Sequence, residues 1–255
     1  MIKLTGTLTG TARRHTPETL AATWQKAFLV LPDGRGGILE TMPDAVTVVG
    51  KFPTVLFCHG SSGVNDAIKT FGRWLARTMK AAFVVPDAMQ LPDRLMYTSP
   101  IAREDYEIIH ALRGQELANA VKELAAAPWF DGRFVIAGTS EGGVTAARFD
   151  RTASTVKEAG RMIFSWSCED NYHVVHHDAK IPDDLPVLNV MSLTDKFFSP
   201  ANPYLDNPAA KGFAADVLKE NTVSSIVLIP GAPHTLLNLP QTQGAVAAFL
   251  KRLGF

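Results

Sequence analysis

Ser140 is the centre of the pentapeptide G-T-S-E-G, which lies between an apolar run and residues that suit a helix. The run Phe134–Ala137 predicts a short buried strand, and residues 144–149 predict the helix. A G-x-S-x-G segment between strand and helix is typical of a sharp turn that exposes a serine hydroxyl. Gly138 and Gly142 suit such a turn because side chains there would collide with the neighbouring strand and helix. The pattern predicts a nucleophile at Ser140, although the pentapeptide alone also fits an ordinary glycine-rich turn.

A serine hydroxyl is a poor nucleophile near neutral pH, so Ser140 needs a general base within hydrogen-bond reach. Four of the seven histidines lie downstream of Ser140, and three of these share one polar loop. His234 instead follows the last predicted strand, residues 225–229, from which the chain can return to the serine. We therefore predict that His234 is the base.

The base needs in turn a carboxylate that orients it and stabilises its charged form. An acid that follows a strand between Ser140 and His234 would suit this role. Asp195 follows the predicted strand at residues 186–191 and fits best. Glu169 and Asp170 follow the preceding predicted strand and remain the alternatives.

The tetrahedral intermediate of acyl transfer needs two hydrogen-bond donors for its oxyanion. The backbone N–H of Glu141, at the start of the predicted helix, is expected to supply one. The second is expected from residues 59–63, which follow an earlier apolar run. Ser61 is the preferred donor, and Ser62 is the alternative. His59 is expected to be structural rather than catalytic.

These residues depend on a sheet that brings distant segments together. Strands alternate with helices along the chain, which predicts an α/β fold with a mostly parallel sheet and helices on both faces. The predicted strands cover residues 26–32, 38–42, 53–58, 81–85, 134–137, 161–166, 186–191 and 225–229. Predicted helices cover residues 105–127, 209–219 and 243–253, and one further helix carries Ile68, Phe71, Leu75 and Met79 on one stripe. The segments expected to carry function follow strands, where the ends of parallel strands meet: 59–63, 138–142, 192–199 and 231–236.

The strand ending in H-G-x-x-G, the G-x-S-x-G-G turn, and an acid and a histidine after later strands resemble the α/β-hydrolase superfamily. The resemblance covers roughly residues 26–253 and is strongest to the dienelactone-hydrolase-like branch. It implies an α/β-hydrolase fold with an eight-stranded sheet, and hydrolysis of a small ester or lactone without a metal or other cofactor. Dienelactone hydrolases proper carry cysteine at the nucleophile position, where this chain has Ser140. This departure favours an ordinary serine carboxylesterase or lactonase.

Length and composition indicate how many domains the chain forms and which classes of partner it binds. With 255 residues and 46% hydrophobic residues, the chain is expected to form a single α/β-hydrolase domain over residues 1–255. Lys+Arg and Asp+Glu are equal at 25 each, so neither a nucleic acid nor a membrane surface is expected as a partner. Two cysteines cannot form a disulfide framework. The lack of a signal-peptide pattern predicts a cytoplasmic location.

Segments outside the strands are expected to shape the substrate site. Residues 1–25 form an N-terminal arm, and the loops at 86–104 and 168–184 are expected to lie over Ser140. The loops suggest a moderately open cleft for a small substrate. The side chains expected to bind that substrate are Ser62, Met89, Met96, Trp166 and Tyr172.

Three histidines in the second loop, His173, His176 and His177, raise the question of a metal site. No cysteine or carboxylate at ligand spacing completes one, so no metal is expected.

Two other functions fit parts of the pattern. A prolyl-oligopeptidase-like peptidase shares this core, but the chain lacks the length for that group's propeller domain. A non-catalytic binding protein with the same fold is the second alternative, and the complete set of Ser140, Asp195 and His234 argues against it. The sequence leaves the oligomeric state open, with a homodimer among the alternatives.

Overall fold

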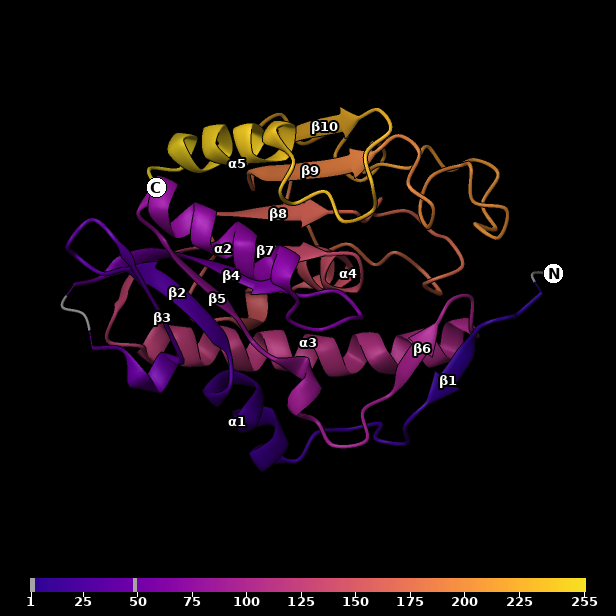
Figure 1. Ribbon diagram of the computed structural model, residues 1–255. Coiled ribbons are helices and arrows are strands. Elements are labelled where there is room, and N and C mark those ends of the chain that lie inside the picture. Colours follow the sequence, from indigo (N-terminus) through magenta and orange to yellow (C-terminus); the bar gives the residue numbers. More distant parts are fainter. Residues whose placement is uncertain (1–2, 48–49) are drawn as a thin grey trace.

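The computed structural model describes residues 3–47 and 50–255. Its largest element is an eight-stranded sheet made of β2 (Phe28–Pro32), β3 (Ile38–Thr41), β4 (Phe52–Cys58), β5 (Ala82–Val85), β7 (Phe130–Thr139), β8 (Gly160–Phe164), β9 (Val187–Ser192) and β10 (Ser225–Ile229). The strands lie in the order β10-β9-β8-β7-β4-β5-β2-β3 (Figure 1). Strand β2 is antiparallel to β3 and β5, and the other neighbouring pairs are parallel. The predicted fold class, a mostly parallel sheet with helices on both faces, is confirmed.

The central strands of the sheet are buried on both faces, which explains why they are apolar runs. In β4, Val55 and Phe57 pack into one core cluster, whereas Leu56 and Cys58 pack into another. The helices divide in the same way: α2 (Asp66–Met79) and α5 (Pro240–Arg252) cover one face, while α1 (Pro17–Gln25), α3 (Arg103–Ala126) and α4 (Glu141–Arg148) cover the other (Figure 1). Within residues 3–47 and 50–255, no helix is both long and apolar enough to cross a membrane.

The N-terminal arm pairs with part of the loop at residues 86–104. Strand β1 (Thr7–Thr9) pairs antiparallel with β6 (Met96–Thr98), apart from the main sheet (Figure 1). Helix α1 follows, with Thr16 as its N-terminal cap. The segment predicted as a loop therefore contains the short strand β6 and the 3₁₀ turn η2 (Ala88–Gln90).

The predicted helix at residues 209–219 is wrong. The segment consists of turns, and three N–H groups in its first half donate to side chains of distant residues instead of to carbonyls one helical turn earlier. Glu169 accepts from Lys211 N–H (2.6 Å) and Gly212 N–H (3.0 Å), and Asn189 accepts from Ala214 N–H (3.0 Å). Gly212 also has a φ of +83°, which a helix does not allow.

A buried arginine on β8 fixes the end of α4, the helix that begins directly after Ser140. The Arg161 guanidinium donates to the carbonyl oxygens of Ala146 (3.1 Å), Ala147 (3.0 Å) and Phe149 (2.8 Å). It is paired with Glu158 at 2.7 Å, and neither side chain is exposed. The charge is therefore satisfied entirely within the protein.

We expect Arg161→Met to lower the free energy of unfolding by about 3–5 kcal/mol, because it leaves the Glu158 carboxylate buried with only the longer contact to Arg151 (3.7 Å). Urea unfolding followed by circular dichroism measures the change. Arg73→Met is the matched control, since the Arg73–Glu40 pair is partly exposed and is expected to contribute less than about 1 kcal/mol. Equal effects of the two substitutions would contradict the assigned role of Arg161.

Candidate active site

Ser140 occupies a sharp turn between β7 and α4. Its φ of 57° and ψ of −121° are rare for a residue with a side chain, so the surrounding packing must hold it there. A Cβ on Gly138 would lie 2.0 Å from the Gly142 carbonyl oxygen, and one on Gly142 would lie 2.0 Å from the Cys58 carbonyl oxygen. Both positions therefore require glycine, for the steric reason that the sequence pattern indicated.

The backbone of Ser140 is held on both sides. Its N–H donates to the Phe164 carbonyl oxygen (2.9 Å), and its own carbonyl oxygen accepts from Gly143 (2.8 Å) and Val144 (3.2 Å). The side chain lines a cavity of about 220 Å³, which His234 also lines. The serine and the predicted base thus share one cavity.

Asp195 and His234 are joined by a short hydrogen bond of 2.7 Å between Oδ2 and Nδ1. The other carboxylate oxygen accepts from the N–H groups of Phe197 (2.9 Å) and Phe198 (3.0 Å), and the Asp195 side chain is not exposed. Burial alone would raise the pKa of Asp195, but these hydrogen bonds outweigh it and hold that pKa below its ordinary value. Because an ionised carboxylate only accepts, the proton must lie on Nδ1 of His234. In the neutral ring, Nε2 is then free to accept a proton.

Two serine hydroxyls hold the loop that carries the histidine. Ser165, just after β8, donates to the His234 carbonyl oxygen (2.5 Å), and Ser192, at the end of β9, donates to the Ala232 carbonyl oxygen (2.7 Å). The Phe197 ring packs edge-on against the imidazole, with the centroids 4.6 Å apart. The imidazole is therefore fixed by its backbone, its carboxylate partner and an aromatic neighbour.

The alternative acids have other roles. Glu169 binds backbone N–H groups at residues 211–212, and Asp170 accepts from the His177 N–H (2.6 Å). The structure places Asp195 against the base, and neither Glu169 nor Asp170 contacts it among the described residues.

The two predicted oxyanion donors lie beside the serine. Glu141 begins α4, so its N–H is at the positive end of the helix. Ser61 lines the same cavity as Ser140, and a Cβ on Gly60 would lie 3.5 Å from the Ser140 Cβ, so this loop packs against the serine. In the part of the chain that the structure describes, neither the Ser61 N–H nor the Glu141 N–H has an acceptor. Both are available to a substrate oxygen.

His59 is structural, as expected. Its Nδ1 donates to the Gly60 carbonyl oxygen (2.7 Å), and its Nε2 accepts from the Ala88 N–H (3.0 Å) and from Arg113 (3.2 Å). Burial and the nearby Arg113 charge hold the pKa of His59 well below its ordinary value. The neutral ring anchors the start of the loop that contains Ser61.

Several predicted substrate contacts are wrong. Ser62 and Tyr172 do line the cavity, but Trp166 is fully buried and packs edge-on against Phe198. The Trp166 Cβ lies only 2.7 Å from where a Cβ on Gly143 would be, so the ring belongs to the core beneath α4.

The two methionines lie outside the lining as well. Met96 is on β6, where 37% of its surface is exposed, and Met89 packs near Gly63. The pairing of β1 with β6 fixes Met96 away from the cavity, and no sequence pattern revealed that pairing.

The cavity wall includes Phe197, Phe198 and His173, which the sequence analysis did not predict as substrate contacts. Phe197 and Phe198 come two and three residues after Asp195, so their position after a predicted strand was a usable signal. Tyr97 and His173 come from the two predicted loops, and the Tyr97 hydroxyl lies 3.0 Å from His173 Nε2. Both loops thus reach the cavity and contact each other at its wall.

The three loop histidines do not form a metal site. His173 is buried among aromatic rings, whereas the His176 side chain is 70% exposed. Residues 3–47 and 50–255 contain no group of three or more His, Cys, Asp or Glu side chains that could hold a metal ion.

Comparison with known proteins identifies the fold. No protein-family profile and no curated protein matches the sequence. Among solved structures, Est1E from Butyrivibrio proteoclasticus is 14% identical, with a TM-score of 0.53 over 89% of this chain and 93% of that one. An esterase from Pyrobaculum calidifontis is 16% identical, with a TM-score of 0.52 over 92% and 87% of the two chains. A dienelactone hydrolase-like promiscuous phosphotriesterase from metagenomic libraries is 16% identical, with a TM-score of 0.53 over 90% and 97%. The chain therefore has the α/β-hydrolase fold, and its likeness to the dienelactone-hydrolase-like branch is confirmed at the level of fold.

The lowered pKa of Asp195 makes a prediction about acid stability. Folding lowers the pKa of this carboxyl group from its value of 3.8 in the unfolded chain. Its ionised form therefore stabilises the folded state at pH values above 3.8, and this contribution is lost as the pH falls through the lower pKa of the folded state. The stability gap between the wild-type chain and Asp195→Asn should therefore be widest near neutral pH and narrow below pH 3.8. Urea unfolding of both proteins across this range measures the gap. A gap that widens at acid pH would contradict the ionised state.

Proposed function

We propose that the chain is a serine hydrolase that cleaves a small carboxylic ester or lactone through an acyl-enzyme on Ser140. The observation that carries this proposal is the 2.7 Å hydrogen bond between Asp195 and His234, beside a serine in a strained turn on the same cavity. The arrangement supplies a nucleophile, a base and an acid in the roles of a catalytic triad.

The first half of the proposed reaction forms the acyl-enzyme. Nε2 of His234 removes the proton from the Ser140 hydroxyl as Oγ attacks the ester carbonyl carbon. The resulting oxyanion accepts hydrogen bonds from the N–H groups of Ser61 and Glu141. Asp195 stabilises the imidazolium that forms. The C–O bond to the alcohol then breaks, and His234 gives its proton to the leaving oxygen.

The second half releases the acid. A water molecule gives a proton to Nε2 of His234 and attacks the acyl carbon, and the same N–H donors bind the second oxyanion. The bond between the carbonyl carbon and Ser140 Oγ breaks, and His234 returns the proton to the serine. In a lactone, the alcohol and the acid belong to one molecule, so a hydroxy acid is the product.

The solved structures with the same fold support ester chemistry, since two of those compared are named as esterases or dienelactone hydrolase-like enzymes. Cavity size is a guide to the substrate. At about 220 Å³, the cavity is smaller than the roughly 300–1,000 Å³ of sites that enclose drug-sized ligands. A compact substrate fits this space.

Ser140→Ala is expected to abolish hydrolysis of p-nitrophenyl acetate and to leave the unfolding transition nearly unchanged. The hydroxyl makes no hydrogen bond within the described residues, so its removal costs the fold little. Steady-state kinetics and urea unfolding measure the two effects. A fluorophosphonate should label the wild-type chain once, at Ser140. Near wild-type turnover by the alanine variant, or labelling at another residue, would remove Ser140 from the mechanism.

We expect kcat/KM to fall as the acyl chain grows from acetyl or butyryl to palmitoyl. A long chain exceeds the cavity, and each CH₂ left in water forgoes about 0.8 kcal/mol of binding free energy. A series of p-nitrophenyl esters at one pH measures the trend. A preference for the palmitoyl ester, with activation at a lipid interface, would indicate a lipase instead.

A further inference from the structure

The side chain of Glu141, the residue after the nucleophile, points into a buried ionic network. Its carboxylate is not exposed, and Oε1 accepts from Arg94 Nη2 (2.9 Å) and lies 3.5 Å from Arg113 Nε. Both arginine side chains are 3% exposed. Arg94 comes from the loop at 86–104 and Arg113 from α3, so separate segments meet beneath the residue that begins α4.

Arg113 joins the two sides of the oxyanion site. Its Nη2 donates to the His59 carbonyl oxygen (2.9 Å), and its Nη1 lies 3.2 Å from His59 Nε2. His59 leads directly into Gly60 and Ser61, whereas Nε of the same guanidinium faces Glu141. One rigid, planar group therefore contacts both segments whose N–H groups are proposed to bind the oxyanion.

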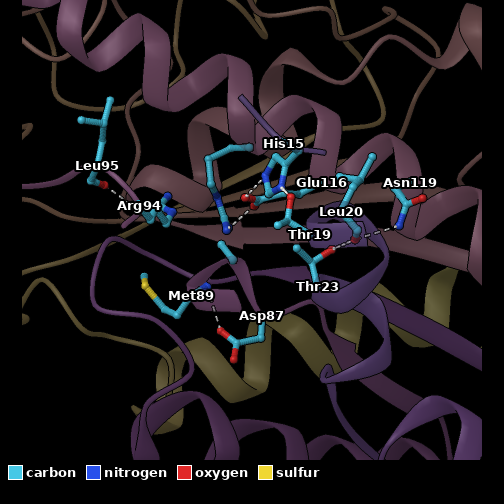
Figure 2. A network of polar contacts seen from close by, with 12 residues as sticks. His15, Thr19, Leu20, Thr23, Asp87, Met89, Arg94, Leu95, Glu116 and Asn119 are labelled. Atoms are coloured by element: carbon cyan, nitrogen blue, oxygen red, sulfur yellow. Dashed lines mark hydrogen bonds and ion pairs between the residues drawn. The ribbon is translucent and has the colours of Figure 1, made fainter. Parts of the chain in front are cut away.

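The N-terminal arm joins the network through His15, which lies beside Glu116 (Figure 2). Arg113 is paired with Glu116 at 2.8 Å, and the other Glu116 oxygen lies 3.0 Å from His15 Nε2. The His15 side chain is only 1% exposed, and its Nδ1 lies 3.3 Å from the Thr19 hydroxyl. The geometry of Arg113 thus depends on contacts that reach into α1.

An unpaired carboxylate at Glu141 would oppose the proposed reaction. The backbone N–H of this residue faces the developing oxyanion, and like charges repel strongly where water is excluded. Burial alone would raise the pKa of Glu141, but the charges of Arg94 and Arg113 hold that pKa below its ordinary value. The carboxylate remains ionised and is compensated by the two guanidinium groups.

We propose that Arg113 is a positioning residue that holds the Gly60–Ser61 loop and Glu141 in the geometry needed to bind the oxyanion. This inference rests on the proposed hydrolase function. Oxyanion donors act only when they lie about 2.7–3.1 Å from the oxygen, so small displacements weaken transition-state stabilisation. Ground-state substrate binding depends less on these donors. Loss of Arg113 should therefore lower kcat more than it changes KM.

The kinetic test compares three variants with the wild-type chain in hydrolysis of p-nitrophenyl acetate. Arg113→Met is expected to lower kcat about 10- to 100-fold, with KM changed less than about threefold. Arg113→Lys keeps the positive charge but loses the planar guanidinium group, so its kcat should lie between that of the wild-type chain and that of Arg113→Met. Arg73→Met, at a partly exposed ion pair, is the matched control and should keep wild-type kinetics. Wild-type kcat in both Arg113 variants would overturn the proposal, as would a loss expressed only in KM.

Amide hydrogen exchange supplies a second readout that does not depend on ester turnover. In the Arg113 variants, peptides covering residues 59–63 and 139–143 should exchange faster, while peptides from α5 should not change. Unchanged exchange in both site peptides would overturn the proposal. If Arg113→Met does not fold, Arg113→Lys alone is used for both the kinetic and the exchange measurements. A wild-type chain that hydrolyses no ester would count against the proposed function alone, and the exchange data would then decide the role of Arg113.

Discussion

The close approach of backbone segments around Ser140 is the constraint on which the site depends. Between β4 and β8, the chain turns from β7 into α4 with no space for a Cβ at Gly138 or Gly142. This contact forces Ser140 into a conformation with positive φ, and it brings the N-terminus of α4 against the end of β4. The exposed hydroxyl, the position of the Glu141 N–H and the neighbouring 59–63 loop all follow from this one turn.

Charged groups buried beneath the turn complete the arrangement. Burying an ion is costly unless a partner and hydrogen bonds compensate it. Glu141 has partners from two other segments, Arg94 of the loop at 86–104 and Arg113 of α3, whereas Arg113 and Glu116, like Arg161 and Glu158, are three residues apart in the sequence. Such pairs have a strict geometry, so they couple the turn to α3, to the loop at 86–104 and, through Glu116, to the N-terminal arm. The arm is therefore part of the site's support, although it lies far from Ser140 in the sequence.

The histidine side of the site is supported differently. His234 lies on a loop, and neutral hydrogen bonds from Ser165 and Ser192 hold that loop by its backbone. Asp195 then fixes the ring through Nδ1. Asp195 is thus the charged partner of the base, and the serine hydroxyls hold the base's loop. The two halves of the site differ in this way: ion pairs support the oxyanion donors, whereas one carboxylate and neutral hydrogen bonds support the base.

Much of the architecture was predictable from local patterns. Apolar runs identified most strands of the main sheet, because strands buried on both faces need continuous apolar sequence, whereas β3 was predicted as the second strand of a hairpin. The G-x-S-x-G turn, and the positions of Asp195 and His234 after later strands, identified the candidate triad, because parallel strands end at one edge. The helix predicted at 209–219 failed, since side chains distant in sequence, Glu169 and Asn189, bind its N–H groups. Trp166 and Met96 were misplaced because sequence does not reveal what packs under α4 or that β1 pairs with β6. The ionic network joining His15 to Glu141 was likewise decided only by tertiary structure, because its members are far apart in sequence and only the folded chain brings their charges within reach of one another.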